Sequence, residues 1–319
     1  MTRRLCALLA VLLAACTPSA SPSLSPTPGP SEPSASTASA TPSPTPQAPA
    51  PIVLAAGDIA ACDSDGDEAT AAMLDGLGGT ILTLGDNAYP DGTTADFANC
   101  YASTWGRHLS RTYPSAGNHE YETAGAAAYF AYFGDRAGNP GEGWYSFDLG
   151  AWHLIALNSN CEAIGGCGPD SPQAEWLRAD LAEHPTTCTL AYWHHPRWSS
   201  GDEHGSDPRT DALWQILFTA GADLVLTGHD HVYERFVPMD ASGAAAPAGA
   251  AAPTGMTEFV VGTGGRSLYA FGALLPTSAT HDNATYGVLQ LTLLADAYDW
   301  EFVSVSGTRF ADSGSAACR

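Results

Sequence analysis

The chain has 319 residues and is strongly acidic, with 34 Asp and Glu residues against 12 arginines, no lysine and a formal net charge of −22. Proteins that bind nucleic acids neutralise the phosphates with clusters of Lys and Arg, so this composition argues against a nucleic-acid-binding module. An anionic substrate would also be repelled, unless bound metal ions supplied positive charge at the site.

The first 15 residues have the pattern of a secretion signal. Arg3 and Arg4 precede an apolar run of about eleven residues, shorter than the roughly 20 that a permanent membrane-spanning helix needs. Leu13-Ala14-Ala15-Cys16 then matches the pattern before a lipid-modified cysteine. We therefore expect an extracellular protein with a lipid anchor at Cys16 on the outer face of the cell membrane. An ordinary cleaved signal peptide, in which Cys16 has no role, is the alternative.

Residues 17–51 are almost entirely Ser, Pro, Thr and Ala, and Glu32 is the one charged residue among them. Such a segment cannot bury enough apolar surface to offset its ordering entropy, and its prolines favour an extended chain. We predict a disordered tether over 17–51 and one catalytic domain over 52–319.

Six cysteines follow Cys16, and an even count in an exported chain indicates disulfides. Cys161 and Cys167 flank a short Gly-rich loop and are expected to pair. Six cysteines allow fifteen connectivities, among which we choose Cys62–Cys100 and Cys188–Cys318 for the rest.

The domain begins with a predicted β-α-β unit. Ile52–Ala56 is a short apolar strand ending in Gly57-Asp58, Glu68–Leu77 has helical periodicity, and Thr80–Leu84 is a strand ending in Gly85-Asp86. Both carboxylates therefore follow the carboxyl ends of strands, where open α/β sheets place their sites.

Later segments repeat this arrangement. The predicted elements are a hairpin of Trp144–Asp148 and Trp152–Leu157, a helix Pro172–Glu183 capped by Ser171, a strand Thr187–Tyr192 before His194, a helix Thr210–Ala220, a strand Asp223–Thr227 before His229 and His231, and β structure over Glu258–Val261 and Tyr286–Val305. Residues 241–254 look like a surface insertion. The mixture predicts an α/β (α+β) fold, a four-layer αββα sandwich of two packed mixed β-sheets flanked by helices.

Seven polar side chains lie in short blocks at or near the ends of apolar runs: Asp58, Asp86, Tyr89, Asn118, His194, His229 and His231. Carboxylate, amide and imidazole groups are suitable ligands for a metal pair. Two metal ions about 3.5–4 Å apart can activate a nucleophile, neutralise charge and stabilise a leaving oxygen. The complete set therefore predicts a two-metal hydrolase, which no single block would do.

The blocks occur in a specific order over roughly 180 residues: Gly57-Asp58, Gly85-Asp86-x-x-Tyr89, Gly117-Asn118-His119-Glu120, His194, and Gly228-His229-x-His231 followed by Val232-Tyr233-Glu234-Arg235. Jointly they resemble the calcineurin-like metallophosphoesterase superfamily and, within it, the purple acid phosphatases. One departure is Ala60, where the family usually has glycine.

The resemblance implies a role for each residue. Asp86 would bridge both metals; the first site would be completed by Asp58, Tyr89 and His231, and the second by Asn118, His194 and His229. His119 would orient the substrate phosphate or protonate the leaving group. His204 falls where the family often has another substrate-facing histidine.

Tyr89 decides the metal that the resemblance implies. A phenolate is a hard anionic oxygen that favours Fe(III), and most other members of the superfamily lack this tyrosine. We therefore expect Fe(III) with Zn, Mn or Fe(II) as its partner.

Other polar residues have simpler interpretations. His195 is expected to be structural or to support the ligands, and His108, His153, His184 and His281 to be ordinary surface or core histidines. The alternating Asp63, Asp65 and Asp67 lack the glutamate of a calcium loop and are expected in a solvated loop near the site. Gly262–Gly265 is expected to be a tight turn near the site.

Three functions remain open. The first is an exported phosphomonoesterase resembling an acid phosphatase, in which a metal-bound hydroxide attacks the phosphorus of a small phosphate ester. The second is a phosphodiesterase acting on nucleotides or lipid head groups. The third is a non-catalytic surface binding protein, which the complete ligand set disfavours because a buried Asp and His cluster without metal is costly. The oligomeric state is left open.

Overall fold

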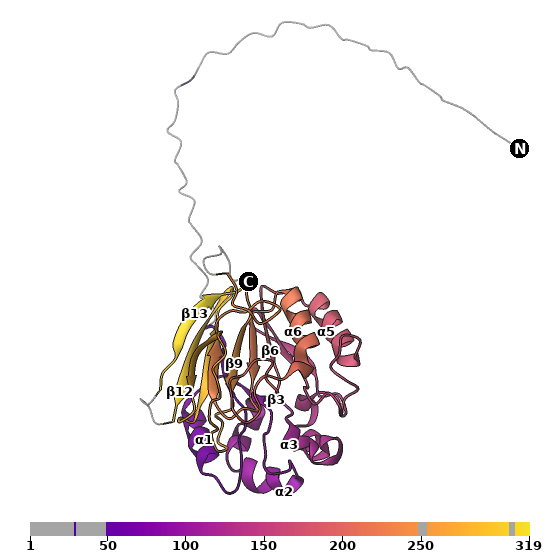
Figure 1. Cartoon of the computed structure of the whole chain (residues 1–319), viewed down its shortest axis with the longest axis vertical. Helices are drawn as coiled ribbons and strands as arrows, with labels where there is room; N and C mark the ends of the chain where they lie inside the picture. The colour runs from indigo at the N-terminus through magenta and orange to yellow at the C-terminus, as the bar shows by residue number, and fades with distance from the viewer. Residues whose placement is uncertain (1–28, 30–48, 248–253, 306–309) are drawn as a thin grey trace, which may run out of the picture. The chain divides into compact units, whose positions relative to one another are not determined.

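The computed structural model describes residue 29 and residues 49–247, 254–305 and 310–319. The predicted signal, the lipid anchor at Cys16 and nearly all of the tether lie outside the described residues, as does part of the predicted insertion at 241–254. The chain divides into the units Met1–Gln47 and Ala48–Arg319. The second unit contains the helices and strands of the described residues (Figure 1).

Two mixed sheets form the centre of this unit. The first has six strands in the order β13-β12-β11-β1-β2-β3, and the second has seven in the order β10-β8-β9-β7-β6-β5-β4. The strands of the first are β1 (Ile52–Ala56), β2 (Thr80–Leu84), β3 (Thr112–Ser115), β11 (Gly287–Leu293), β12 (Ala297–Ser304) and β13 (Ser313–Ala317). Those of the second are β4 (Tyr145–Leu149), β5 (Trp152–Ala156), β6 (Cys188–Tyr192), β7 (Leu224–Thr227), β8 (Tyr233–Phe236), β9 (Thr257–Val261) and β10 (Ser278–Asp282).

Helices of different lengths connect the strands. The α-helices are α1 (Gly66–Gly76), α2 (Thr94–Asp96), α3 (Asn118–Tyr121), α4 (Ala127–Phe133), α5 (Pro172–Glu183) and α6 (Asp211–Ala220). A π-helical turn, η1 (Phe97–Tyr101), and the 3₁₀ segments η2 (Trp105–Arg111), η3 (Ala124–Ala126), η4 (Gly134–Ala137) and η5 (Pro208–Thr210) lie between them. None of the helices in the described part of the chain has the length and hydrophobicity needed to cross a bilayer.

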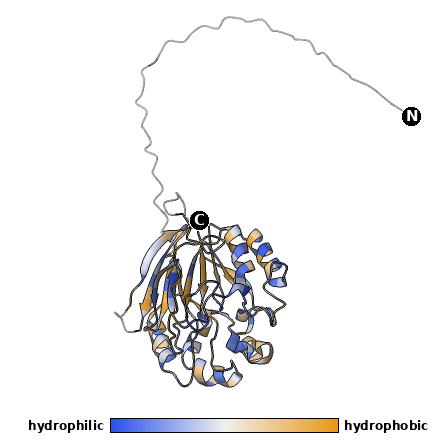
Figure 2. Cartoon of the chain, viewed as in Figure 1, coloured by the Kyte–Doolittle hydropathy of each residue, from blue (hydrophilic) through white to orange (hydrophobic). Residues whose placement is uncertain are grey.

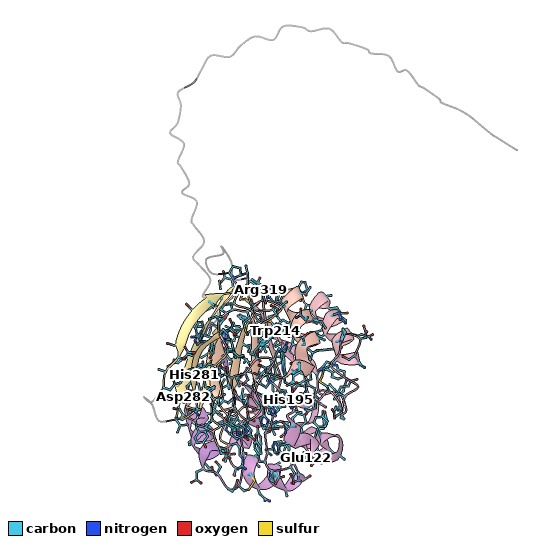
Figure 3. All side chains as sticks on the ribbon, viewed as in Figure 1. Glu122, His195, Trp214, His281, Asp282 and Arg319 are labelled. Atoms are coloured by element: carbon cyan, nitrogen blue, oxygen red, sulfur yellow. A yellow bond between two sulfur atoms is a disulfide. The ribbon has the colours of Figure 1, made fainter. Side chains whose placement is uncertain are left out.

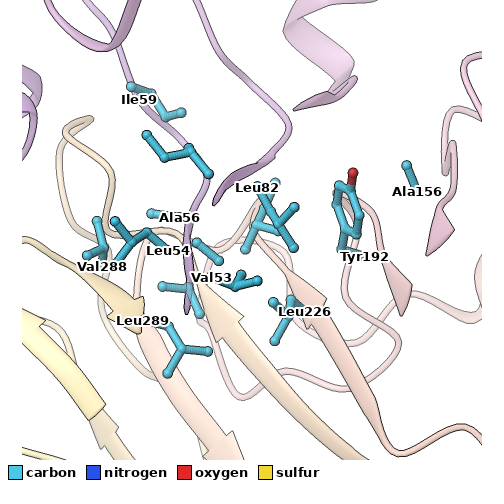
Figure 4. Close-up of a cluster of buried hydrophobic side chains, with 14 of the residues drawn as sticks. Val53, Leu54, Ala56, Ile59, Leu82, Ala156, Tyr192, Leu226, Val288 and Leu289 are labelled. Atoms are coloured by element: carbon cyan, nitrogen blue, oxygen red, sulfur yellow. The ribbon is translucent and has the colours of Figure 1, made fainter. Parts of the chain in front are cut away.

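The main core lies between the two sheets. Leu54 and Leu289 from the first sheet and Tyr192 and Leu226 from the second belong to one cluster of fully buried side chains (Figure 4). Because alternate residues of a strand face opposite sides, the neighbouring Ala191 belongs to a second cluster. The central strands of the second sheet, β5, β6, β7 and β9, are therefore buried on both faces.

The second cluster lies under α5 and α6, which pack side by side on one flank of the unit (Figure 1). Leu177 of α5 and Leu213 and Leu217 of α6 are fully buried there. The strands are mostly hydrophobic and the helices carry hydrophilic segments, as expected for helices with one exposed face (Figure 2). Ser171 caps α5, since its hydroxyl accepts a hydrogen bond from the Ala174 amide at 3.3 Å. The predicted arrangement of two packed sheets flanked by helices is confirmed.

Parallel pairing decides where the loops meet. β1, β2 and β3 run parallel in the first sheet, and β5, β6, β7 and β9 run parallel in the second. All the predicted ligands follow the carboxyl ends of these strands. The loops of the two sheets meet there, since the Gly57 amide donates to the Val261 carbonyl at 2.9 Å and the His229 amide to Oδ2 of Asp58 at 2.9 Å.

Among the described residues there are three disulfides, Cys62–Cys100, Cys161–Cys167 and Cys188–Cys318, and the predicted pairing is confirmed. The third links β6 of the second sheet to the residue after β13 of the first. It lies at the amino end of β6, whereas His194 follows the carboxyl end of the same strand.

Candidate metal centre

Three of the predicted ligands have unusual backbone conformations. Asp58, Asp86 and His229 have φ values of 61°, 50° and 71°, in the left-handed region that side chains other than glycine rarely adopt. Such conformations cost free energy and cluster at functional sites. Gly85 allows a close approach beside them, because a Cβ at this position would lie 2.5 Å from Nδ1 of His194.

One half of the centre gathers around the phenol of Tyr89. Its Oη lies 3.1 Å from Oδ1 of Asp58, 3.0 Å from Oδ2 of Asp86 and 3.1 Å from Nε2 of His231. Nε2 of His231 is also 3.3 Å from Oδ1 of Asp58. One phenol proton cannot satisfy three such acceptors, so the arrangement has spare electron pairs facing one point.

The other half gathers around His194. Its Nε2 lies 3.0 Å from Oδ1 of Asn118, 3.2 Å from Oδ2 of Asp86 and 3.2 Å from Nδ1 of His229. One ligand atom from each of Asp86, His194 and His229 falls within 4.8 Å of the others. Asp86 contacts both halves, which is the position that a bridging carboxylate requires.

The histidine rings are held so that a nitrogen faces the cluster. Nδ1 of His194 lies 2.8 Å from the Leu84 carbonyl, and Nδ1 of His231 lies 2.6 Å from the Ser267 carbonyl. A metal-binding histidine normally donates its other ring N–H to such a partner. The donor set of carboxylate, amide, phenol and imidazole groups, oriented in this way, fits a pair of metal ions.

Glu120 supports the centre, although the sequence alone predicted no role for it. Its fully buried carboxylate accepts hydrogen bonds from the amides of Asp86 (3.0 Å), Asn87 (2.7 Å) and Gly117 (2.7 Å). Burial and the nearby Asp86 carboxylate raise its pKa to about 7. Glu120 thus joins the loop after β2 to the loop after β3. Its place in the block Gly117-Asn118-His119-Glu120 was the only signal in the sequence.

Asp230, between the two histidines of its block, is a second support that the sequence did not reveal. It is fully buried and accepts hydrogen bonds from the Ser199 hydroxyl (2.5 Å) and from the amides of His204 (3.2 Å) and Gly205 (3.0 Å). Burial raises its pKa. Asp230 therefore fixes the loop that carries His204.

The two histidines predicted to face the substrate lie at the rim. His119 has a side chain that is 34% exposed, its Nε2 is 3.8 Å from Oδ2 of Asp86, and its ring centroid is 4.4 Å from that of Tyr89. His204 is exposed and stacks on His229 with 3.9 Å between ring centroids. Tyr269, for which the sequence gave no signal, stacks on His231 at the same distance.

The carboxylates of the cluster raise the pKa values of two of the predicted ligands. Burial lowers the pKa of His194, but the Asp86 carboxylate outweighs burial and raises this pKa to about 9. Burial and the carboxylates of Asp86 and Asp58 raise the pKa of Tyr89 well above its ordinary value. Without metal, His194 and Tyr89 therefore hold protons at neutral pH, and metal binding must displace them.

His195 lies behind the ligands, as predicted. It is buried, its Nδ1 is 2.7 Å from the Ser159 hydroxyl, and its ring centroid is 4.3 Å from that of His229. Burial lowers its pKa well below the ordinary value. Figure 3 shows His195 near the middle of the view of the unit and Arg319 at its upper end.

Two predictions about the surrounding loops have different outcomes. The turn Gly262–Gly265 is beside the site, as predicted, because the amide of Gly264 donates to the Gly57 carbonyl at 2.9 Å. The loop of alternating aspartates is solvated at Asp63 and Asp65, but Asp67 is only 1% exposed, and there the prediction is wrong. Asp67 lies in the first turn of α1, which packs tightly against Gly265.

The fold and the cluster together define a metallophosphoesterase. Residues 52–233 match the family model of the calcineurin-like phosphoesterases, and the chain belongs to this family.

Among curated proteins, the chain is similar to purple acid phosphatase 15 of Arabidopsis thaliana, with 28% identity over 191 residues that cover 49% of this chain and 35% of the plant protein. It is also similar to acid phosphatase type 7 of Danio rerio, with 30% identity over 153 residues that cover 39% of this chain and 33% of the fish protein. Each match thus spans about a third of the relative.

Two solved structures share the fold. The purple acid phosphatase PPD1 from yellow lupin (Lupinus luteus) seeds has a TM-score of 0.72 at 20% identity, covering 85% of this chain and 54% of the lupin chain. GAP50, the anchor in the inner membrane complex of Plasmodium, has a TM-score of 0.64 at 15% identity, covering 85% of this chain and 90% of that chain.

Proposed function

We propose that this chain is an exported hydrolase of phosphate monoesters that works with two metal ions. The observation that carries the proposal is the position of Asp86, whose Oδ2 lies within 3.2 Å of both Oη of Tyr89 and Nε2 of His194. One carboxylate shared by two ligand groups is the arrangement that a dinuclear site needs. The family and the similarity to acid phosphatases support the same activity.

In this proposal, Asp58, Tyr89 and His231 would hold one metal ion, Asn118, His194 and His229 would hold the other, and Asp86 would be shared by both. When bound, the two ions would supply the positive charge that attracts the phosphate and promotes deprotonation of the attacking water. This charge also accounts for how a chain with a net charge of −22 can attract an anion.

The histidines at the rim act on the substrate. His119 is partly exposed beside Asp86, within reach of a phosphate oxygen or of the leaving oxygen, and a neutral or charged imidazole can donate a hydrogen bond to either. His204 stacks on His229 and presents its exposed edge to the same rim. We assign His119 to orientation of the phosphate or protonation of the leaving group, and His204 to substrate contact.

Tyr89 points to iron. A buried phenol has a high pKa and binds as a phenolate only where a strong Lewis acid replaces its proton, and Fe(III) is such an acid. We propose Fe(III) beside Tyr89 and Zn, Mn or Fe(II) in the other position. Iron-loaded protein should show a visible absorption band that Tyr89→Phe removes. A colourless wild type that is fully active with divalent metal alone would contradict the assignment.

The three disulfides support export, because such bonds persist in oxidising compartments. We propose that a lipid at Cys16 holds the protein at the outer face of the cell membrane through the tether 17–51. Fractionation of cells that express wild type and Cys16→Ser tests this step. Wild type should be in the membrane fraction and the variant in the medium or periplasm; the same fraction for both would contradict the anchor.

The activity is tested with purified protein loaded with iron and zinc. We expect hydrolysis of phenyl phosphate that Asp86→Asn abolishes. A preference for bis(p-nitrophenyl) phosphate over the monoester by more than about tenfold in kcat/KM, equivalent to about 1.4 kcal/mol, would favour a phosphodiesterase instead. Wild type that binds metal but hydrolyses neither ester would favour a non-catalytic binding protein.

A further inference from the structure

One cation lies at the rim of the metal centre in this acidic chain. The guanidinium carbon of Arg266 is 5.3 Å from the centroid of the Tyr89 ring, and the Arg266 amide donates to the Asp58 carbonyl at 2.8 Å. In the described part of the chain, no other arginine has a hydrogen bond, ion pair or ring contact with a predicted metal ligand. Since the chain has no lysine, Arg266 is the one permanent positive side chain in contact with this site among the described residues.

The guanidinium is available to an incoming anion. Arg266 is 30% exposed, and its single ion pair joins one nitrogen to Oδ1 of Asp63 at 2.9 Å. The Asp63 side chain is itself 78% exposed. An ion pair between exposed groups contributes only about 0–1 kcal/mol, so an anion held nearby can replace Asp63 at little cost.

The position of Arg266 indicates which part of a substrate it would meet. It packs on the ring of Tyr89 and pairs outward with Asp63, and it makes no ion pair with Asp58 or Asp86 at the floor of the centre. A phosphate on the metal ligands would therefore be bound deeper than Arg266. The guanidinium would reach a group on the leaving part of the ester, and its planar fork suits a carboxylate or a second phosphate.

We propose that Arg266 selects phosphate monoesters whose leaving group carries a second anionic group, and that Asp63 holds the guanidinium in place until such a substrate replaces it. This inference rests on the proposed function, because it concerns the same site. It adds the class of substrate, an ester with two separated anionic groups.

A matched pair of substrates tests the proposal: phenyl phosphate and 4-carboxyphenyl phosphate, which differ by one carboxylate. With metal-loaded protein, Arg266→Gln should lower kcat/KM about tenfold more for the carboxylated ester than for phenyl phosphate, the fold-change expected for one charge-assisted hydrogen bond. Asp63→Asn should raise kcat/KM for the carboxylated ester, because it removes the competing anion. Arg107→Gln, which removes an exposed arginine that pairs with Asp75, is the control for net charge.

Arg266→Gln and Asp63→Asn together distinguish a role of Arg266 in substrate recognition from a role in holding the loop. Both remove the ion pair between Asp63 and Arg266, so a purely structural role predicts losses in both. Substrate recognition predicts opposite changes. Binding of benzylphosphonate and 4-carboxybenzylphosphonate, measured by calorimetry, should show the same pattern without turnover.

Equal losses on both esters in Arg266→Gln, no loss on either, or a loss in Asp63→Asn would overturn the inference. A wild type that hydrolyses neither ester contradicts the proposed function, and the inference then falls with it. A wild type that hydrolyses phenyl phosphate, with no dependence of the carboxylated ester on Arg266, contradicts the inference alone.

Discussion

The described part of the chain contains two clusters of histidine and aspartate that are alike in composition and differ in how their histidine rings are paired. The first is the candidate metal centre around Asp86, His194 and His229. The second lies on the second sheet and α5, where His153, Asp180 and His184 also place ligand atoms within 4.8 Å of one another. The two clusters differ in which groups the ring nitrogens of their histidines contact.

In the second cluster both nitrogens of His153 are already paired. Nδ1 lies 2.8 Å from Asp148 and Nε2 lies 2.8 Å from Asp180, so the ring is a cation between two carboxylates. Its residues lack the left-handed backbone found at Asp58, Asp86 and His229. At the candidate metal centre, Nδ1 of His194 and of His231 lies against a backbone carbonyl instead, and Nε2 of each ring faces the carboxylate, amide and phenol groups of the cluster. Composition alone therefore does not define a metal site; the convergence of several ligand atoms on a shared carboxylate does.

The largest effect should come from the shared carboxylate. Asp86→Asn removes the group that contacts both halves of the centre, and we expect kcat/KM on phenyl phosphate to fall by more than about a hundredfold, with loss of bound metal. Metal content by mass spectrometry and steady-state kinetics measure both. Asp180→Asn in the second cluster is the control and should leave metal content unchanged. Loss of metal in Asp180→Asn instead would break the distinction between the clusters.

The second effect is on stability and concerns the other cluster. His153 is 1% exposed, and removing one partner of a buried ion pair costs about 3–5 kcal/mol. His153→Gln should lower the free energy of unfolding, measured with urea, by about 3 kcal/mol. Its metal content and visible spectrum should match wild type. A variant as stable as wild type would show that the pair contributes nothing.

Glu120 should have an intermediate effect on the metal centre. Glu120→Gln replaces an acceptor of several amide hydrogen bonds, and loss of such a support costs about 10–100-fold in metal affinity or activity. Glu122→Gln, two residues away and exposed (Figure 3), is the matched control. Competition with a chelator measures the affinity. Equal affinities in the two variants would remove Glu120 from the support of the site.

The smallest effect is a change of stability with pH. Burial lowers the pKa of His153, but its hydrogen bonds to Asp180 and Asp148 outweigh burial and raise this pKa above 6.5. Because the raised pKa belongs to the folded state, the stabilisation is complete below the unfolded value and is lost as pH rises through the folded one. The stability difference between wild type and His153→Gln should therefore shrink between pH 6 and alkaline pH, measured by urea unfolding. A difference that grows over this range would contradict the assigned charge.

The sequence predicted the parts of this molecule whose signal is local. Thr80–Leu84 and Pro172–Glu183 are observed with the predicted bounds, because an apolar run and a capped amphipathic helix are defined by neighbouring residues. β10 and β13 were missed, since Ser278–Asp282 and Ser313–Ala317 have little apolar character and are strands through their partners. The hairpin was predicted, although its first strand begins and ends one residue later than expected.

In the candidate site, too, the sequence predicts what a local signal defines and misses what depends on folding. The seven proposed ligands were named from the sequence because their blocks occur in the order of a known family and most of the blocks follow a predicted strand, and the structure brings them together. The roles of Glu120, Asp230 and Tyr269 depend on which amide or ring comes to face them after folding. No spacing in the sequence distinguishes the ring of His153, paired on both sides, from that of His194.

The disulfide between Cys188 and Cys318 joins the two sheets at a distance from the candidate metal centre. Asp58, Asp86 and Asn118 follow strands of one sheet, whereas His194, His229 and His231 follow strands of the other. The centre thus lies between the two sheets. The disulfide joins these sheets at the amino end of β6, the opposite end of that strand from His194. We therefore expect metal affinity to depend on how rigidly the two sheets are held together. Reduction of this disulfide should lower the affinity for the metal ions without changing any metal ligand.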